Sequence, residues 1–147
     1  MHLLAIVSLW MFLMLPFKPA EKKPDITGTW KLISGITESG NDVVITDYTH
    51  GKSFIKVINA THFAFFLHDV EKGKGTTPLY GSGGGPYTLK GNQYTEYLEY
   101  CNDREWEGHD FTFTVTLRND TLVQTGREKV ESAGIDRVNT EKYVRMR

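Results

Sequence analysis

The sequence predicts an all-β fold, a single antiparallel up-and-down barrel of about eight to ten strands. Aromatic residues make up 12% of the 147 residues, a composition that suits pleated, half-buried strands. From residue 25 onward, short strand-like segments alternate with Gly, Asn and Asp, and no helical periodicity extends beyond about ten residues. There are enough of these segments to close a barrel.

The strand candidates are joined by turn-forming residues. Asn59-Ala60-Thr61 and Arg118-Asn119-Asp120 have hairpin chemistry, and Gly91 supplies the positive φ of a tight reversal. We therefore expect consecutive strands to be neighbours. The long segment 70–86, rich in glycine, is expected to be an irregular connection at the mouth of a binding site. The expected strands cover residues 28–36, 42–48, 53–59, 61–69, 87–90, 93–101, 110–118, 121–130 and 141–146.

The first 17 residues contain a continuous apolar run, residues 3–17, that is shorter than a membrane-spanning helix requires. We interpret residues 1–20 as a signal peptide or N-terminal anchor and residues 21–147 as the barrel domain. The protein is then expected to be secreted or periplasmic, with no stable membrane span once processed. The lysines that follow the run, Lys18, Lys22 and Lys23, reverse the usual charge order, which keeps the anchor alternative open.

Charge and cysteine content exclude several classes of function. With 17 Lys and Arg against 18 Asp and Glu, the formal net charge of −1 offers no basic surface for nucleic acid. Cys101 is the single cysteine, so neither an intrachain disulfide nor a cysteine-based zinc site can form. His62 and His68 share a strand face but lie roughly 20 Å apart at the strand rise of ~3.3 Å per residue, too far to share a metal ion. No cofactor and no metal site are predicted.

Strand alternation assigns the inner face of the barrel. In segment 110–118 the apolar residues alternate strictly with threonines, which places Phe111, Phe113, Val115 and Leu117 inside. In segment 61–69 the inner face carries Phe63, Phe65 and Leu67, and in segment 93–101 it carries Tyr94, Glu96, Leu98 and Tyr100.

Glu96 is therefore expected among aromatic side chains. An isolated ionised carboxylate is costly in an apolar interior, so Glu96 must pair with a cation, accept hydrogen bonds or hold a proton through a raised pKa. It either contacts a ligand or serves a structural role, tied to a barrel-crossing Arg or Tyr. The turn residue Trp106 is assigned to the surface, with a rim contact as the alternative.

Two motifs carry a resemblance to a known family. Gly28-Thr29-Trp30 opens the first strand and Arg145 closes the last, which resembles the lipocalin pattern of an early Gly-x-Trp and a late Arg. The run 84–96 is similar to short lipocalin-like (calycin superfamily) domains of unknown function in exported bacterial proteins. The resemblance implies that Arg145 packs over the Trp30 indole at the closed end and that the barrel encloses a cavity.

These expectations lead to three hypotheses of function. The first is a non-enzymatic binding protein for a small hydrophobic or aromatic molecule. The second is an isomerase- or cyclase-type enzyme with Glu96 as base and Tyr94 or Tyr87 as hydrogen-bond donor. The third is a structural or interaction module whose barrel is filled by its own side chains. The predicted ligand-binding residues are Phe63, Phe65, Tyr87, Tyr94, Glu96, Leu98, Tyr100, Phe111 and Phe113.

Overall fold

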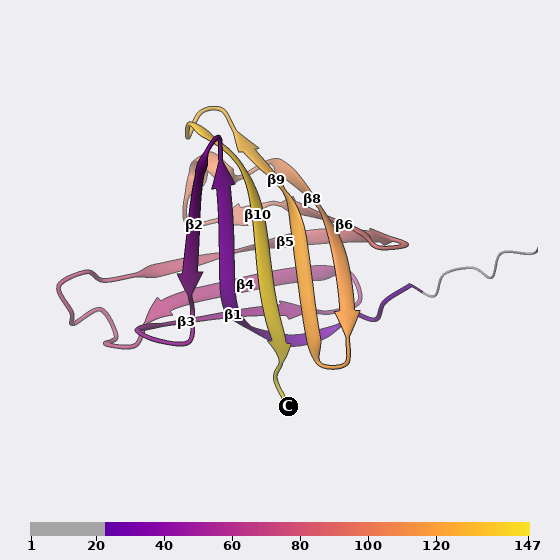
Figure 1. Cartoon of the computed structure of the whole chain (residues 1–147), viewed down its shortest axis with the longest axis horizontal. Helices are drawn as coiled ribbons and strands as arrows, with labels where there is room; N and C mark the ends of the chain where they lie inside the picture. The colour runs from indigo at the N-terminus through magenta and orange to yellow at the C-terminus, as the bar shows by residue number, and fades with distance from the viewer. Residues whose placement is uncertain (1–22) are drawn as a thin grey trace, which may run out of the picture.

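Strand pairing runs without interruption around the molecule in the computed structural model, which describes residues 23–147 (Figure 1). The strands follow the order β10-β9-β8-β6-β5-β4-β3-β1, and β1 then pairs with β10 to close the ring. Eight antiparallel strands form this barrel, and β2 and β7 are additions to it. The predicted all-β, up-and-down barrel is confirmed. The apolar run 3–17 and the proposed boundary at residue 20 lie outside the described residues.

The strand bounds agree with the sequence pattern for most of the chain. The only helical element among residues 23–147 is a single 3₁₀ turn, η1, and no helix in this part is long and apolar enough to cross a membrane. The elements are β1 (Gly28–Ser39), β2 (Asp42–Asp47), β3 (Lys52–Ile58), β4 (His62–Asp69), β5 (Tyr80–Lys90), β6 (Gln93–Leu98), β7 (Tyr100–Cys101), η1 (Arg104–Trp106), β8 (His109–Arg118), β9 (Thr121–Val130) and β10 (Ile135–Arg145).

On the side away from β10, strand β1 pairs with two different strands. Its first residues pair with β3 and its later residues, from Ser34 onward, pair with β2, with a register irregularity between Leu32 and Ser34. Because a bulge bends a strand, β1 can leave β3 at this point and continue upward with β2 beside it (Figure 1). The β1–β2 hairpin thus extends one wall of the barrel.

The glycine-rich segment differs from the prediction. Residues 70–86 were expected to be irregular, but β5 already begins at Tyr80 and includes the glycines 83–85. These glycines permit close backbone approach: a Cβ on Gly85 would lie 1.9 Å from the Tyr97 carbonyl oxygen, and one on Gly84 would lie 2.6 Å from that of Phe63. Here the missing side chains allow tight strand packing, whereas sequence reasoning interpreted them as flexibility.

Strand β10 is also longer than predicted, because it begins at Ile135 instead of residue 141. The prediction relied on apolar alternation, and this strand alternates polar residues on its inner side. Arg137, Asn139 and Glu141 all face the interior, where they line a cavity. A strand whose inner face is polar therefore lacks the alternation of apolar residues by which strands are predicted from sequence.

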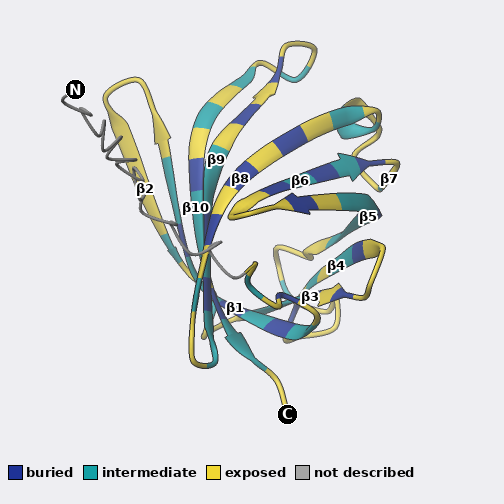
Figure 2. Ribbon diagram, turned by 90° about the vertical axis from the view of Figure 1, so that its right-hand side faces the viewer, coloured by how far each residue is buried: buried dark blue, intermediate teal, exposed yellow. Residues whose placement is uncertain are grey.

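Buried residues occur along most of the strands (Figure 2), and the apolar core includes a group at the end of the barrel where β1 starts and β10 ends. The predicted inner faces of β4 and β8 are confirmed by the burial of Phe63, Phe111, Phe113 and Val115. Burying aromatic and branched side chains of this size contributes about 1.5–3 kcal/mol each. The fully buried residues at this end include Ile26, Trp30, Leu32, Leu122 and Tyr143.

Candidate functional site

An interior cavity of about 430 Å³ occupies the other half of the barrel. Every strand except β5 contributes to its wall, so the space lies along the barrel axis. Its volume falls in the range of natural small-molecule sites. The wall consists of Gly35, Thr37, Thr46, Tyr48, Phe54, Lys56, Phe65, Glu96, Leu98, Cys101, Asn102, Asp103, Trp106, Phe111, Phe113, Gln124, Glu128, Arg137, Asn139 and Glu141.

Aromatic rings form two facing parts of this wall. Phe54 of β3 stacks on Phe65 of β4, with ring centroids 5.6 Å apart and planes 8° from parallel, and Tyr48 meets Phe54 edge-on at 6.0 Å. On the other side Trp106 packs against Phe111 at 5.6 Å. The surface assignment of Trp106 was therefore wrong: the 3₁₀ turn folds its indole back over the barrel, where it borders the cavity.

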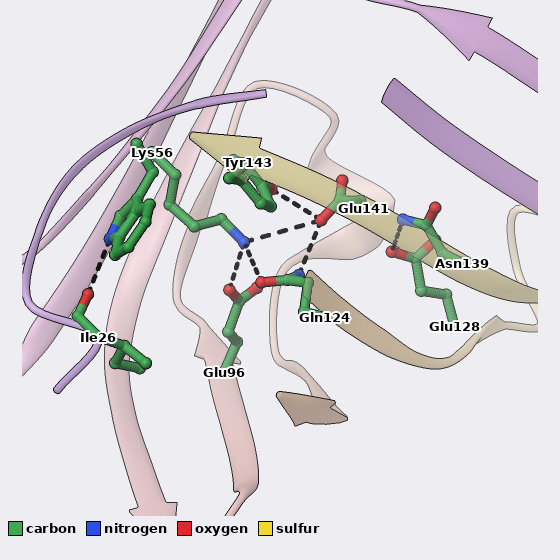
Figure 3. A network of polar contacts seen from close by, with 9 residues as sticks. Ile26, Lys56, Glu96, Gln124, Glu128, Asn139, Glu141 and Tyr143 are labelled. Atoms are coloured by element: carbon green, nitrogen blue, oxygen red, sulfur yellow. Dashed lines mark hydrogen bonds and ion pairs between the residues drawn. The ribbon is translucent and has the colours of Figure 1, made fainter. Parts of the chain in front are cut away.

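The deep end of the cavity holds a buried polar network contributed by β3, β6, β9 and β10 (Figure 3). The Lys56 ammonium donates to Glu96 Oε1 at 2.7 Å and to Gln124 Oε1 at 3.1 Å. The Gln124 amide donates to Glu141 Oε2 at 2.7 Å, and the Tyr143 hydroxyl donates to the same oxygen at 2.8 Å. Lys56 lies 3.9 Å from Glu141. One cation thus sits between two carboxylates.

The register of the strands explains why these groups meet. Gln124 and Glu141 are directly opposed across the β9–β10 pair, so their side chains leave the sheet together on the inner face. Lys56 and Glu96 come from β3 and β6, which are not neighbours, and their contact spans the barrel interior. The network therefore links walls that share no backbone hydrogen bonds.

Burial governs the electrostatics of this end. Removal from water raises the pKa of the Glu96 carboxyl, and the neighbouring Lys56 ammonium opposes that rise. Burial, reinforced by the nearby Glu141 carboxylate, raises the pKa of Tyr143 far above its usual range. The pKa of Tyr94 is raised by burial and then by the Glu96 charge. The Tyr94 hydroxyl is buried without a hydrogen-bond partner among residues 23–147.

A second, less buried network borders the mouth of the cavity. Arg137 donates through Nε to Glu128 at 2.7 Å, and the Asn139 amide donates to the other Glu128 oxygen at 2.9 Å. The Arg137 guanidinium also lies 5.5 Å from the centroid of the Trp106 ring. Both oxygens of Glu128 are therefore occupied, and Arg137 is held between a carboxylate and an indole.

The structure brings five of the nine predicted ligand-binding residues to the cavity wall: Phe65, Glu96, Leu98, Phe111 and Phe113. Phe63 and Tyr94 point inward but belong to the packed core. Tyr87 packs against Tyr94 with centroids 5.2 Å apart, and its hydroxyl donates to the Asn59 carbonyl at 2.8 Å, so it does not reach the cavity. The predicted inward face of β6 is confirmed for Tyr94, Glu96 and Leu98.

The inward placement of Tyr100 was wrong. Its side chain is 69% exposed, because the strand is interrupted at Glu99, between β6 and β7. The extra residue shifts the alternation by one, so that Cys101 faces the cavity in place of Tyr100. The amide of Glu99 bonds to the Gly84 carbonyl at 3.1 Å, which fixes the interruption against the glycine run of β5.

Sequence reasoning missed the polar partners of Glu96. Lys56 lies between Phe54 and Ile58 on one side of β3, so alternation places it on the inner face. Gln124 alternates with Leu122 in the same way. These polar residues at inward positions were the available signal. What alternation does not give is which strands face each other across the barrel.

The closed end carries the arrangement that the resemblance implied. Arg145 lies directly opposite Trp30 in the β1–β10 pair, with its guanidinium 4.2 Å from the centroid of the indole ring. It donates to the carbonyls of Thr27 at 2.6 Å and Asp25 at 3.3 Å, while the Trp30 indole donates to the Ile26 carbonyl at 2.8 Å. The segment before β1 is thereby fastened across the end of the barrel.

Fold and site together define a closed up-and-down β-barrel with an interior cavity that is aromatic on its sides and ionic at its deep end. No protein-family model matches the chain, and no curated protein matches it at a significant level. Among solved structures, a mutant of the fluorescent protein UnaG aligns over 83% of this chain and 96% of that chain, with 12% sequence identity and a TM-score of 0.37. So distant a likeness adds nothing to what strand pairing and the cavity wall establish.

Proposed function

We propose that this protein binds a small hydrophobic or aromatic molecule inside the barrel. The observation that carries the proposal is the cavity of about 430 Å³, which is walled by aromatic rings and ends in fixed polar groups. Natural ligand sites combine an apolar wall with a few placed polar groups in this way. Stacked rings such as Phe54 and Phe65 suit a flat ligand, and the charged end would fix its orientation.

The cavity favours this hypothesis over the two alternatives. A structural module with a filled barrel would leave no space of this size. An enzyme with Glu96 as base and Tyr94 or Tyr87 as donor would need these groups around one reacting atom. Here Glu96 is paired with Lys56, and neither tyrosine borders the cavity. The groups that the enzyme hypothesis requires are therefore not assembled at the cavity wall.

The test is binding of a neutral aromatic dye, N-phenylnaphthylamine, followed by its fluorescence. We expect saturable binding in the micromolar range or tighter, with energy transfer from Trp106 at the cavity wall. Thr37→Trp places a large ring at the cavity wall and should block binding. Thr116→Trp places the same ring on the outer face of β8 and serves as the matched control. Absence of dye binding, or equal binding by both variants, contradicts the proposal.

We further propose that the protein is exported, with the apolar run 3–17 acting as the targeting signal. Support comes only from the length and composition of this run. Expression in a host with two membranes, followed by fractionation and mass measurement of the purified chain, tests it. A mature protein that starts near residue 21 in the periplasmic fraction is the expected result, and a full-length chain in the cytosol contradicts it.

A further inference from the structure

The charges around the cavity are unequal. Among residues 23–147, four carboxylates border it, from Glu96, Asp103, Glu128 and Glu141, and two cations do, Lys56 and Arg137. Asp103 is exposed at the mouth, but the other three carboxylates are buried or half-buried. The enclosed part of the wall therefore holds three acids against two bases.

Both cations are already engaged. Lys56 donates to Glu96 and Gln124 and lies 5.2 Å from the centroid of the Tyr143 ring, and it is only 2% exposed. Arg137 is bound by Glu128 and lies over the Trp106 ring. Within the described part of the chain, a ligand carboxylate entering the cavity would meet three protein carboxylates and no cation that is not already paired. Desolvating an acidic ligand there would be unfavourable.

One carboxylate retains an oxygen for a donor. The two hydrogen bonds to Glu141 and its approach to Lys56 all involve Oε2, and Oε1 has no partner among residues 23–147. The Glu141 side chain is 15% exposed and borders the cavity. The deep end thus has spare capacity to accept a hydrogen bond from a charged donor.

Removal from water raises the pKa of the Glu96 carboxyl, and the nearby Glu141 carboxylate adds to that rise while Lys56 opposes it. The excess of acids is not arranged for a metal ion, since no three His, Cys, Asp or Glu side chains converge as ligands among residues 23–147.

We propose that the cavity selects an aromatic or hydrophobic molecule carrying a protonated amine, which donates to Glu141 Oε1 at the deep end. This rests on the proposed binding function and specifies its ligand class. The ammonium supplies the positive charge that the wall lacks, and a charged hydrogen bond in a buried setting is stronger than a neutral one. The rings of Phe54, Phe65, Phe111 and Trp106 hold the apolar body and also attract a cation to their faces.

The test compares three probes that share one ring system and differ in charge: naphthylethylamine, naphthylethanol and naphthylacetate. Each is titrated against the bound N-phenylnaphthylamine dye at neutral pH. We expect the amine to bind about tenfold or more tightly than the alcohol, and the acid to bind most weakly. If the acid binds as tightly as the amine, the inference is wrong, but the proposed binding function still stands.

A second experiment substitutes Glu141, the proposed contact of the amine. Glu141→Gln keeps an oxygen that can accept from Gln124 and Tyr143 but removes the excess charge, so the amine should lose its advantage over the alcohol. Glu99→Gln changes an outward-facing carboxylate and should retain that advantage. Dye and alcohol affinities should be the same in both variants. An amine preference that survives in Glu141→Gln overturns the inference, whereas failure of every probe and the dye overturns the binding function as well.

Discussion

The two halves of the barrel interior are built on opposite principles. At the closed end, the apolar side chains of Ile26, Trp30 and Leu32 are at most 1% exposed, and Arg145 covers the indole from outside. In the cavity half, the wall combines aromatic rings with charged residues and encloses about 430 Å³ of space. The closed end is densely packed, whereas the cavity half leaves space and holds polar groups in fixed positions. We therefore expect the closed end to contribute mainly to stability and the cavity half mainly to ligand selectivity.

Lys56 joins the two halves, because it pairs with Trp30 in the backbone register while its ammonium enters the ionic network. Removing the cation gives the largest expected effect. Lys56→Met keeps most of the side-chain volume but leaves Glu96 buried without its partner, which should lower the free energy of unfolding by about 3–5 kcal/mol. Urea denaturation at neutral pH measures the loss.

The pH dependence of this variant follows from Glu96. Without Lys56 the main influence that opposes burial is lost, so the folded-state pKa of Glu96 lies further above its unfolded value. A carboxyl with a raised folded-state pKa costs stability above that pKa, and the cost disappears as pH falls through it. The deficit relative to wild type should therefore shrink on acidification. Lys129→Met, which removes an exposed partner of Glu131, is the control; an equal loss there would contradict a role for burial.

An intermediate effect on the free energy of unfolding is expected at the closed end. Arg145→Ala removes the contact with the Trp30 ring and leaves the carbonyls of Thr27 and Asp25 without their donor. We expect a loss of about 1–2 kcal/mol, together with a red shift of Trp30 emission as water reaches the indole. Dye binding in the cavity should be unaffected. Arg147→Ala, at an arginine that contacts Asp120 on the surface, should change neither signal, and a similar shift there would refute the capping role.

How much the sequence could predict differs between the halves in the same way. The closed end follows from a motif, because Trp30 and Arg145 each carry a local signal. The cavity half depends on which strands face each other across the axis, so the Lys56–Glu96 contact, 40 positions apart in sequence, leaves no local trace. The polar inner face of β10 and the interruption at Glu99 escaped for a related reason: both break the hydrophobic alternation on which strand prediction depends.

The smallest effect is expected on the outer surface, where an ion pair of good geometry contrasts with the buried pair. Arg127 donates twice to Asp136, at 2.7 and 2.6 Å, from opposing strands, but the two side chains are 65% and 48% exposed. Water and salt screen such a pair, and its members keep their hydration when separated. Arg127→Ala should therefore leave the urea midpoint nearly unchanged at physiological salt, far from the loss in Lys56→Met. If the two losses were comparable, burial would not be what distinguishes the Lys56–Glu96 pair, and the contrast between interior and surface charges would fail.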